Sequence, residues 1–488
     1  MTLDLLRFTT AGSVDDGKST LIGRLLYDSK QVFEDQLQHV AQASERRGGA
    51  GALDLALLTD GLRAEREQGI TIDVAYRYFA TARRRFIIAD CPGHQQYTRN
   101  MVTGASTADL AVILLDARRG VQEQSRRHAF ISALLGIPHL VVAVNKMDLV
   151  EHSRERFREL VEEFEGFAHR LGGDREADRR AGTKRAGTNG HGRARDIAYI
   201  PISALNGDNV VERSEPMSWY DGPTLLELLE TVEVAYDHPD ETPARLPVQW
   251  VIRVGGVRHT AAANGGDPAN GDGSGDGSVN GNSSANGNVT ARGGGATPGD
   301  YRGYAGQLAS GALRRGEEIA VLPSGHTTRI AAIDTFDGEL EEALAPMSVT
   351  LRLQDELDVS RGELICRPDQ EPTVARELRA DVCWMSERPL RAGGRYLIKH
   401  TTRTASVIVD ELRNLLDVRT LERTDEPPAE FQLNDIGHVH LRASSPLVFD
   451  PYTRNRRTGS FILIDESSNE TVAAGMIAAG RVDRDRSG

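Results

Sequence analysis

Gly12-Ser13-Val14-Asp15-Asp16-Gly17-Lys18-Ser19-Thr20 fits the phosphate-loop pattern G-x-x-x-x-G-K-[ST]. Residues 3–10 before it are apolar and β-branched, as in a buried strand, and residues 19–27 after it carry Leu and Ile at helical spacing. The pattern requires this order of strand, loop and helix, in which backbone N–H groups point at phosphate oxygens. Lys18 can reach the β- and γ-phosphates, and the Ser19 hydroxyl can ligate Mg²⁺. The stretch therefore predicts a bound nucleotide, and it leaves the base and the reaction open.

The chain has 488 residues, which is too long for one hydrophobic core and suggests about three domains. Over residues 1–235, apolar strand-like runs alternate with helical patterns, and the clearest runs are 85–90, 108–116, 140–145 and 197–203. This alternation predicts an α/β domain with a doubly wound, mostly parallel sheet. Ligands of such sheets bind at the carboxyl ends of the strands, where this chain places Asp90, Asn145 and Ser203.

From Thr242 onward the sequence changes to short alternating runs separated by Gly, Asp and Pro. This pattern predicts two all-β barrels, over residues 242–367 and 373–483. We expect two insertions that lack hydrophobic periodicity. One is a polar, mobile surface loop at about 165–195, and the other is a disordered Gly/Asn/Asp-rich extension of the first barrel at about 259–300.

The composition excludes several classes of protein. The net charge of −13 and the scarcity of lysine argue against a nucleic-acid-binding surface, and they also fit a high-salt host. The chain opens without a signal peptide, and no apolar run approaches the roughly 20 residues that span a bilayer, so we expect no membrane contact and a cytoplasmic location. The cysteines form no C-x-x-C pair, so neither a disulfide framework nor a zinc site is indicated; they are Cys91, Cys366 and Cys383.

The base is indicated by Asn145-Lys146-Met147-Asp148, which ends an apolar run. A carboxylate such as that of Asp148 can accept hydrogen bonds from both N1–H and N2–H₂ of guanine, a donor pair that adenine lacks. Asn145 can tie this loop to the phosphate loop, and the stem of Lys146 can lie along the base. Ser203-Ala204-Leu205 follows another predicted strand and can offer a backbone N–H to the guanine O6. These motifs predict GTP as the nucleotide.

The segment Asp90-Cys91-Pro92-Gly93-His94 also follows a predicted strand. Asp90 can hold Mg²⁺ through water, the Gly93 N–H can sense the γ-phosphate, and His94 can orient the attacking water. Thr71 is the candidate switch threonine, with its hydroxyl on Mg²⁺. The expected metal-ligating residues are therefore Ser19, Thr71 and Asp90, and the expected catalytic residues are Lys18, Thr71 and His94. Taken alone, the segment could also be a turn that ends a strand.

With these motifs in this order, the chain resembles the translational GTPases of the elongation-factor class. Within that class it is similar to the large subunits of bacterial heterodimeric sulfate adenylyltransferases. The stretches that carry the resemblance are 12–26, 59–73, 94–101 and 383–390. Elongation factors usually have Gly-His-Val-Asp where this chain has Gly12-Ser13-Val14-Asp15, so Ser13 and Asp16 favour the sulfate-activating branch. Gln95, Cys91 and the two insertions depart from the common pattern and put contacts with a partner in doubt.

The resemblance implies an α/β P-loop GTPase domain followed by two all-β barrels, with GTP and Mg²⁺ as cofactors. It also implies a small catalytic adenylyltransferase subunit as partner, in a heterodimer that can assemble further. That subunit would make adenosine 5′-phosphosulfate and pyrophosphate from ATP and sulfate, the first step of sulfate assimilation, while this chain hydrolyses GTP to drive the reaction. A fused adenylylsulfate kinase activity is not expected, because the sequence has no second phosphate loop.

Two other functions are compatible with parts of the sequence. An elongation-factor-type GTPase that delivers aminoacyl-tRNA would share the GTPase domain and the barrels, but it fits the acidic composition and the Ser13/Asp16 loop less well. A P-loop kinase for a small molecule would share only the phosphate loop. The guanine motif at Asn145–Asp148 and the two barrels weaken that alternative.

Overall fold

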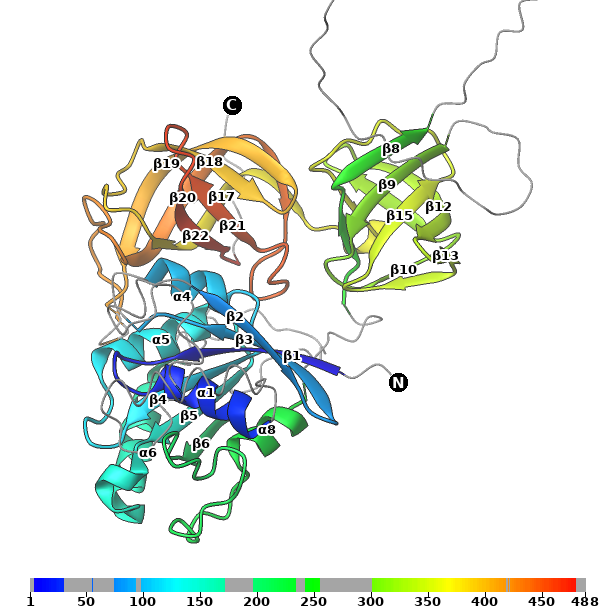
Figure 1. The fold of residues 1–488 in the computed structure, drawn as a ribbon. Coiled ribbons are helices and arrows are strands. Elements are labelled where there is room, and N and C mark those ends of the chain that lie inside the picture. The colour runs from blue at the N-terminus through cyan, green and yellow to red at the C-terminus, as the bar shows by residue number, and fades with distance from the viewer. Residues whose placement is uncertain are drawn as a thin grey trace, which may run out of the picture.

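The computed structural model describes residues 4–29, 55, 74–93, 98–171, 196–233, 242–254, 301–417, 420 and 422–479. They form an α/β domain and two β domains, as expected (Figure 1). Two of the predicted site residues, Thr71 and His94, lie outside the described residues. So do residues 172–195 and 255–300, which hold most of the first expected insertion and all of the second.

The α/β domain is built on a six-stranded sheet in the order β2-β3-β1-β4-β5-β6. All neighbouring strands are parallel except β2, which pairs antiparallel with β3 at one edge, so the prediction of a mostly parallel sheet is confirmed. The strands are β1 (Asp4–Ala11), β2 (Ala75–Ala80), β3 (Arg84–Asp90), β4 (Leu110–Asp116), β5 (His139–Asn145) and β6 (Asp196–Pro201).

Helices cover both faces of this sheet, because its central strands are apolar on both sides. Along β4, Leu110, Val112 and Leu114 pack in one core, and the alternate residues pack in the other. The first core includes α1 (Lys18–Asp28) and α8 (Leu225–Thr231), and the second includes α4 (Thr98–Ala105), α5 (Glu123–Leu134) and α6 (Arg154–Leu171). A 3-10 turn, η3 (Met147–Val150), follows β5.

The end of α6 corrects the expected start of the first insertion. The helix continues to Leu171, so residues 165–171 are helical rather than irregular. Its buried Leu160, Phe164 and Phe167 have the spacing of one helix face, and this apolar face keeps the segment packed against the sheet.

The first β domain is a curled eight-stranded sheet with the order β7-β16-β11-β12-β15-β9-β8, to which β13 is added beside β12. Its two end strands follow one another in the chain. The N–H of Val248 bonds to Glu363 O at 2.8 Å, whereas that of Gln249 bonds to Ala305 O at 2.9 Å. The chain changes neighbours there, the hydrogen-bonded path from β7 to β8 is not closed, and this first of the two expected β domains is a half-barrel.

The strands of the half-barrel sheet are β7 (Arg245–Pro247), β8 (Trp250–Val254), β9 (Tyr301–Gln307), β11 (Glu318–Leu322), β12 (His326–Thr335), β13 (Gly338–Leu340), β15 (Ser348–Leu353) and β16 (Leu364–Cys366). A separate two-stranded sheet consists of β10 (Ala312–Arg314) and β14 (Glu342–Leu344). The 3-10 turn η4 (Pro368–Gln370) leads to the last domain.

The second β domain is a closed barrel with the strand order β17-β20-β19-β18-β21-β22, as predicted. Its interior is apolar, and every second residue of β17 from Leu378 to Trp384 points into it. The strands are β17 (Thr373–Trp384), β18 (Arg395–His400), β19 (Arg403–Leu415), β20 (Ile436–Phe449), β21 (Ser460–Ile464) and β22 (Thr471–Ile477).

The closed barrel rests on α4 and α5 of the α/β domain (Figure 1). The apolar outer side chains of the barrel join the same core as α5; they are Cys383, Met385, Leu416, Ile436, Tyr452 and Met476. The Tyr452 hydroxyl donates to Leu135 O at 2.7 Å, and Arg456 donates to Ser106 O at 3.3 Å. The α/β domain and the barrel thus share one continuous hydrophobic core.

The three cysteines are buried free thiols, as the sequence indicated. Burial raises the pKa of each to about 12, so they are protonated at neutral pH. Within the described ranges, no group of His, Cys, Asp and Glu side chains is arranged to hold a metal ion, and no helix is long and apolar enough to cross a lipid bilayer.

Candidate nucleotide-binding site

The phosphate loop connects β1 to α1, and its backbone needs glycine at two places. Gly12 and Gly17 have φ of 151° and 94°, conformations that residues with a Cβ rarely adopt. Space is limiting as well, because a Cβ at Gly12 would lie 2.9 Å from Leu114 O and one at Gly17 would lie 2.4 Å from Asn145 Nδ2. The curl that aims backbone N–H groups at a ligand therefore depends on both glycines.

Lys18 is buried inside this curl. Its Nζ donates to Gly12 O at 3.1 Å and to Ser13 O at 2.8 Å. Burial lowers the pKa of Lys18, and the nearby carboxylates of Asp90 and Asp16 oppose that shift. The ammonium is thus held at the centre of the loop, where phosphate oxygens would approach.

Asp16 is the unusual residue of the loop. Its Oδ2 accepts from Ser13 N–H at 2.6 Å, while its buried Oδ1 has no hydrogen-bond partner among the described residues. Burial raises the pKa of Asp16 to about 6, against the lowering effect of Lys18. The Asp16 carboxyl is therefore largely protonated, and so uncharged, below about pH 6.

The segment Asp90–Gly93 lies beside the phosphate loop. The Thr10 hydroxyl donates to Asp90 Oδ1 at 3.2 Å and orients this carboxylate at the end of β3. A Cβ on Gly93 would lie 2.4 Å from Lys18 Nζ, which shows how closely the turn passes. The Cys91 side chain is directed into the core, where its Sγ lies 3.0 Å from Thr9 Oγ1. The side chain of Cys91 is therefore not available to a ligand at this site.

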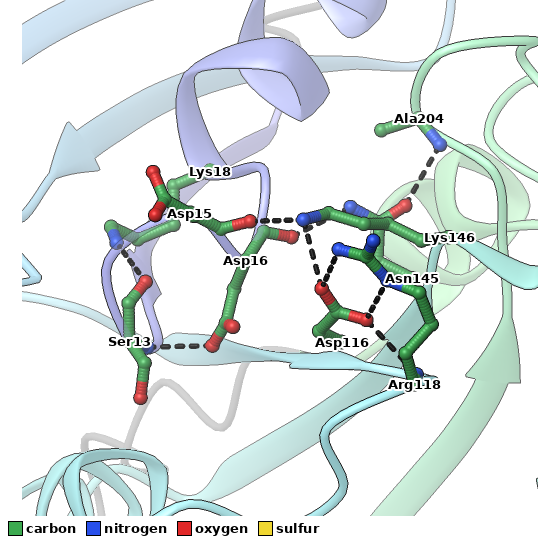
Figure 2. A network of polar contacts seen from close by, with 9 residues as sticks. All are labelled: Ser13, Asp15, Asp16, Lys18, Asp116, Arg118, Asn145, Lys146 and Ala204. Carbon is green, nitrogen blue, oxygen red and sulfur yellow. Dashed lines mark hydrogen bonds and ion pairs between the residues drawn. The ribbon is translucent and has the colours of Figure 1, made fainter. Parts of the chain in front are cut away.

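Asn145 joins three loops (Figure 2). Its Nδ2 donates to Asp16 O at 2.7 Å, and its Oδ1 accepts from Ala204 N–H at 2.9 Å. Ser203 donates from its hydroxyl to Asp148 Oδ1 at 2.7 Å. The structure therefore brings the two segments expected to read the base, 145–148 and 203–205, onto the phosphate loop. Met147 is the exception, because its side chain is buried in the core.

Asp116, at the end of β4, is a site residue that the sequence analysis did not identify. Lys146 Nζ lies 2.9 Å from Asp116 Oδ2 and also donates to Asp15 O (Figure 2). Arg118 binds both carboxylate oxygens, at 3.1 and 2.7 Å. Burial would raise the pKa of Asp116, but the hydrogen bonds from Arg118 and Lys146 hold it below its usual range. Asp116 thus fixes the lysine whose stem is expected along the base.

Two further residues support the site from other elements. Arg24 of α1 donates from Nε to Ala204 O at 3.2 Å and also bonds to Leu205 O, which anchors the segment 203–205. His128 of α5 accepts a hydrogen bond from Gly12 N–H at its Nδ1, at 2.9 Å. Neither belongs to a recognised motif, so spacing in the sequence carried no signal for them. Asp116 did leave a signal, because it ends a strand as Asp90 and Asn145 do.

Comparison with protein-family models divides the chain as the structure does. The model of the elongation factor Tu GTP binding domain matches residues 3–236. The GTP-eEF1A C-terminal domain-like model matches residues 377–478, which lie in the closed barrel. The loops described above therefore belong to a GTP-binding domain.

Relatives in other organisms match nearly the whole chain. Sulfate adenylyltransferase subunit 1 of Bacteroides fragilis (strain YCH46) is 47% identical over 475 residues, covering 97% of this chain and 86% of the relative. The same subunit of Citrobacter koseri is 48% identical over 474 residues, with 97% and 86% covered. The bifunctional enzyme CysN/CysC of Mycobacterium tuberculosis (strain CDC 1551 / Oshkosh) is 50% identical over 474 residues, but the match spans only 67% of that enzyme. By this similarity and by its GTP-binding domain, the chain belongs to the sulfate adenylyltransferase subunit 1 family.

Proposed function

We propose that this chain is the GTP-hydrolysing subunit of a sulfate adenylyltransferase. The observation that carries the proposal is the position of Asn145, whose amide joins the phosphate loop at Asp16 to the segment around Ala204. This connection fixes the distance between the phosphate-binding and base-reading parts of the site. A guanine nucleotide is the ligand that fits both parts.

Guanine selectivity is assigned to Asp148. Its carboxylate is oriented by the Ser203 hydroxyl through Oδ1 at 2.7 Å, and it retains lone pairs for the N1–H and N2–H₂ of guanine. Ala204 N–H is already bonded to Asn145, so the donor to the guanine O6 in this segment is assigned to Leu205 N–H. Adenine would leave the carboxylate unpaired, which is costly in a partly buried site.

The phosphates are assigned to the loop N–H groups and to Lys18. Ser19 at the start of α1 and Asp90 at the end of β3 offer the hard oxygen donors that Mg²⁺ prefers, and Asp90 is already oriented by Thr10. These residues fit a magnesium ion, with Thr71 proposed as a further ligand. When bound, Mg²⁺ neutralises charge on the β- and γ-phosphates.

Hydrolysis is the attack of water on the γ-phosphorus. A bond forms between the water oxygen and phosphorus, and the bond from phosphorus to the β–γ bridging oxygen breaks, which yields GDP and phosphate. Lys18 stabilises the charge that shifts toward the leaving β-phosphate. Gly93 N–H is assigned as the sensor of the γ-phosphate, and His94 as the residue that orients the water.

The partner is proposed to be the small catalytic subunit, which transfers the adenylyl group of ATP to sulfate. Relatives named subunit 1 cover 97% of this chain, which supports a partner-dependent activity. The translation-factor alternative has weaker support, because it rests on the family models for single domains.

The test uses the purified chain with the small subunit from the same genome. We expect phosphate release from GTP, and pyrophosphate release that depends on sulfate, ATP and GTP together. A non-hydrolysable GTP analogue should support binding and lower the pyrophosphate yield. Equal pyrophosphate release without GTP, a preference for ATP in the phosphate assay, or tight GTP-dependent binding of aminoacyl-tRNA would contradict the proposal.

A further inference from the structure

His128 lies in the middle of α5 and is completely buried next to the phosphate loop. Its Nδ1 accepts the N–H of Gly12 at 2.9 Å. Gly12 is the first residue of the loop and directly follows the last residue of β1, Ala11. Without the imidazole, this buried donor would have no partner, because the Gly12 backbone makes no other hydrogen bond as a donor in the part of the chain that the structure describes.

The bond to Gly12 determines the form of the ring. A nitrogen that accepts from an N–H carries no proton, so the proton of neutral His128 is on Nε2. His128 Nε2 lies 2.9 Å from Nε2 of Gln124, one turn earlier on α5. Because this proton needs an acceptor, we assign the Gln124 amide the flipped orientation, in which its oxygen faces His128. Burial and the charge of Lys18 lower the pKa of His128 to about 3, so the ring stays neutral at physiological pH.

The same helix contacts the loop a second time and reaches the closed barrel at its other end. Ser125 Oγ lies 3.4 Å from Ser13 Oγ. Leu135, which caps α5, accepts the hydrogen bond from Tyr452 of the barrel at 2.7 Å. Burial raises the pKa of Cys383 and of Asp435 in the barrel, and the charge of Arg127, next to His128 in sequence, is close enough to oppose both shifts. One helix therefore contacts both the first two residues of the phosphate loop and the barrel.

We propose that His128 is a positioning residue of the GTP site, which holds the first turn of the phosphate loop in its ligand-binding shape by accepting the Gly12 N–H. The inference rests on the proposed function, because it assigns a role in GTP binding. His128 touches no reacting atom. It acts through the loop that binds the phosphates. The position of His128 is in turn fixed by α5, whose C-terminal end packs against the closed barrel.

The first test compares two substitutions at one position in the full chain. His128→Leu keeps the apolar volume but removes the acceptor. The unpaired Gly12 N–H then favours other loop shapes in the free chain, and because GTP binding must restore the original shape at a cost of about 1.4 kcal/mol, we expect GTP affinity to fall about tenfold. His128→Asn places its Oδ1 near the position of Nδ1, and we expect it to recover affinity to within about threefold of the original chain. GTP affinity is measured by calorimetry, and the free energy of unfolding is measured in urea for each variant.

Ser132→Ala is the matched control. Ser132 is buried one turn after His128 on the same helix, and its hydroxyl has no hydrogen-bond partner among the described residues. We expect this variant to bind GTP as the original chain does. A loss of affinity in Ser132→Ala equal to that in His128→Leu would show general damage to α5 and would overturn the assignment. So would equal affinities in the Leu and Asn variants.

A second measurement uses the unaltered chain, so it can be made even if the variants of His128 do not fold. In the unaltered chain with ¹⁵N-labelled histidine, His128 should show an unprotonated Nδ1 and a protonated Nε2 that do not titrate between pH 5 and pH 8, a window set by its lowered pKa. A proton on Nδ1 would overturn the inference even if His128→Leu fails to fold. A chain that hydrolyses ATP instead of GTP would overturn the proposed function and leave this tautomer result unaffected.

Discussion

The guanidinium of Arg245 and the carboxylate of Asp450 form a two-point ion pair between the half-barrel and the closed barrel, with N–O distances of 2.9 and 3.0 Å. Both side chains are almost inaccessible, with exposed fractions of 0% and 2%. Both side chains make further hydrogen bonds. The Thr458 hydroxyl donates to Asp450 Oδ2 at 2.6 Å, and Arg245 donates to Ala244 O at 2.9 Å. The two β domains are therefore held together by a buried pair whose polar atoms are satisfied.

Removing one member of this pair should be costly. Asp450→Asn or Arg245→Met would leave an uncompensated buried charge and should lower the free energy of unfolding by about 3–5 kcal/mol. The double variant Arg245→Met/Asp450→Leu should lose less than the sum of the single variants, because no charge is left unpaired. Urea unfolding at pH 7 measures all three. Additive losses would contradict the role of the pair.

The same pair predicts a loss of stability in acid. Burial would raise the pKa of Asp450, but the hydrogen bonds from Arg245 and Thr458 lower it overall. A carboxyl whose pKa is lower in the folded state stabilises the fold above its unfolded value of about 3.9, and the stabilisation is lost as pH falls through the folded value. Part of the acid sensitivity below about pH 4 should therefore disappear in the double variant.

Asp16 should have the opposite dependence on pH. Burial raises its pKa from 3.8 to about 6, so the folded state prefers the protonated carboxyl. As pH rises from about 4 to about 6, the chain should lose on the order of 1–3 kcal/mol of stability relative to Asp16→Asn, which cannot ionise but can still accept from Ser13 N–H. Urea unfolding across this range measures the difference. A constant difference between the two proteins would show that Asp16 does not titrate there.

Base selectivity should change when Asp148 loses its charge. Asp148→Asn presents an amide in place of a carboxylate, so it cannot accept from both N1–H and N2–H₂ of guanine, and it should shift preference from GTP toward the xanthine nucleotide. Calorimetric titration with both nucleotides measures the shift. Ser203→Ala is the comparison variant, because it removes only the hydroxyl that orients Asp148. It should lower the affinity for GTP without raising the affinity for the xanthine nucleotide. Unchanged GTP preference in Asp148→Asn would refute the assignment of the base-reading residue.

Tyr452→Phe should loosen the contact between the closed barrel and α5. The lost hydrogen bond to Leu135 O is worth about 1 kcal/mol of unfolding free energy. Tyr78→Phe is the control, since Tyr78 is exposed on β2 and its variant should stay within about 0.5 kcal/mol of the original chain. If both variants unfold at the same denaturant concentration as the original chain, the hydrogen bond between Tyr452 and Leu135 contributes nothing to stability.

His94→Ala should separate binding from hydrolysis. If His94 orients the attacking water, its loss should lower the rate of GTP hydrolysis by about a hundredfold or more and change GTP affinity by much less. Single-turnover phosphate release and calorimetry give the two quantities. Equal losses in rate and affinity would assign His94 to nucleotide binding instead.

The sequence alone predicted the α/β domain because its strands are buried on both faces and leave long apolar runs. The run at 85–90 corresponds to β3 (Arg84–Asp90), and the run at 140–145 corresponds to β5 (His139–Asn145). It also placed Asn145 and Asp148 at the end of a strand, where the structure has them beside the phosphate loop. Local patterns of this kind do not depend on contacts with distant segments.

Other parts depend on contacts that a single sequence does not display. Arg24 meets Ala204 across 180 residues, and His128 meets Gly12 across 116 residues. The open path of the half-barrel depends on one change of neighbour at residues 248–249, which alternation along the strand cannot reveal. The edge strand β2 is not among the clearest runs of the sequence, because its exposed Tyr76 and Tyr78 break the apolar pattern.

The core that joins α5 to the closed barrel has a consequence for how the chain can be divided. Side chains such as Cys383 and Met385 belong to the barrel in sequence but are buried against helices of the α/β domain. A recombinant fragment that ends near residue 236 would carry every GTP-binding motif, yet it would expose the apolar surface that these side chains cover. Such a fragment should aggregate, and the intact chain should unfold in calorimetry with the α/β domain and the barrel melting as one cooperative unit.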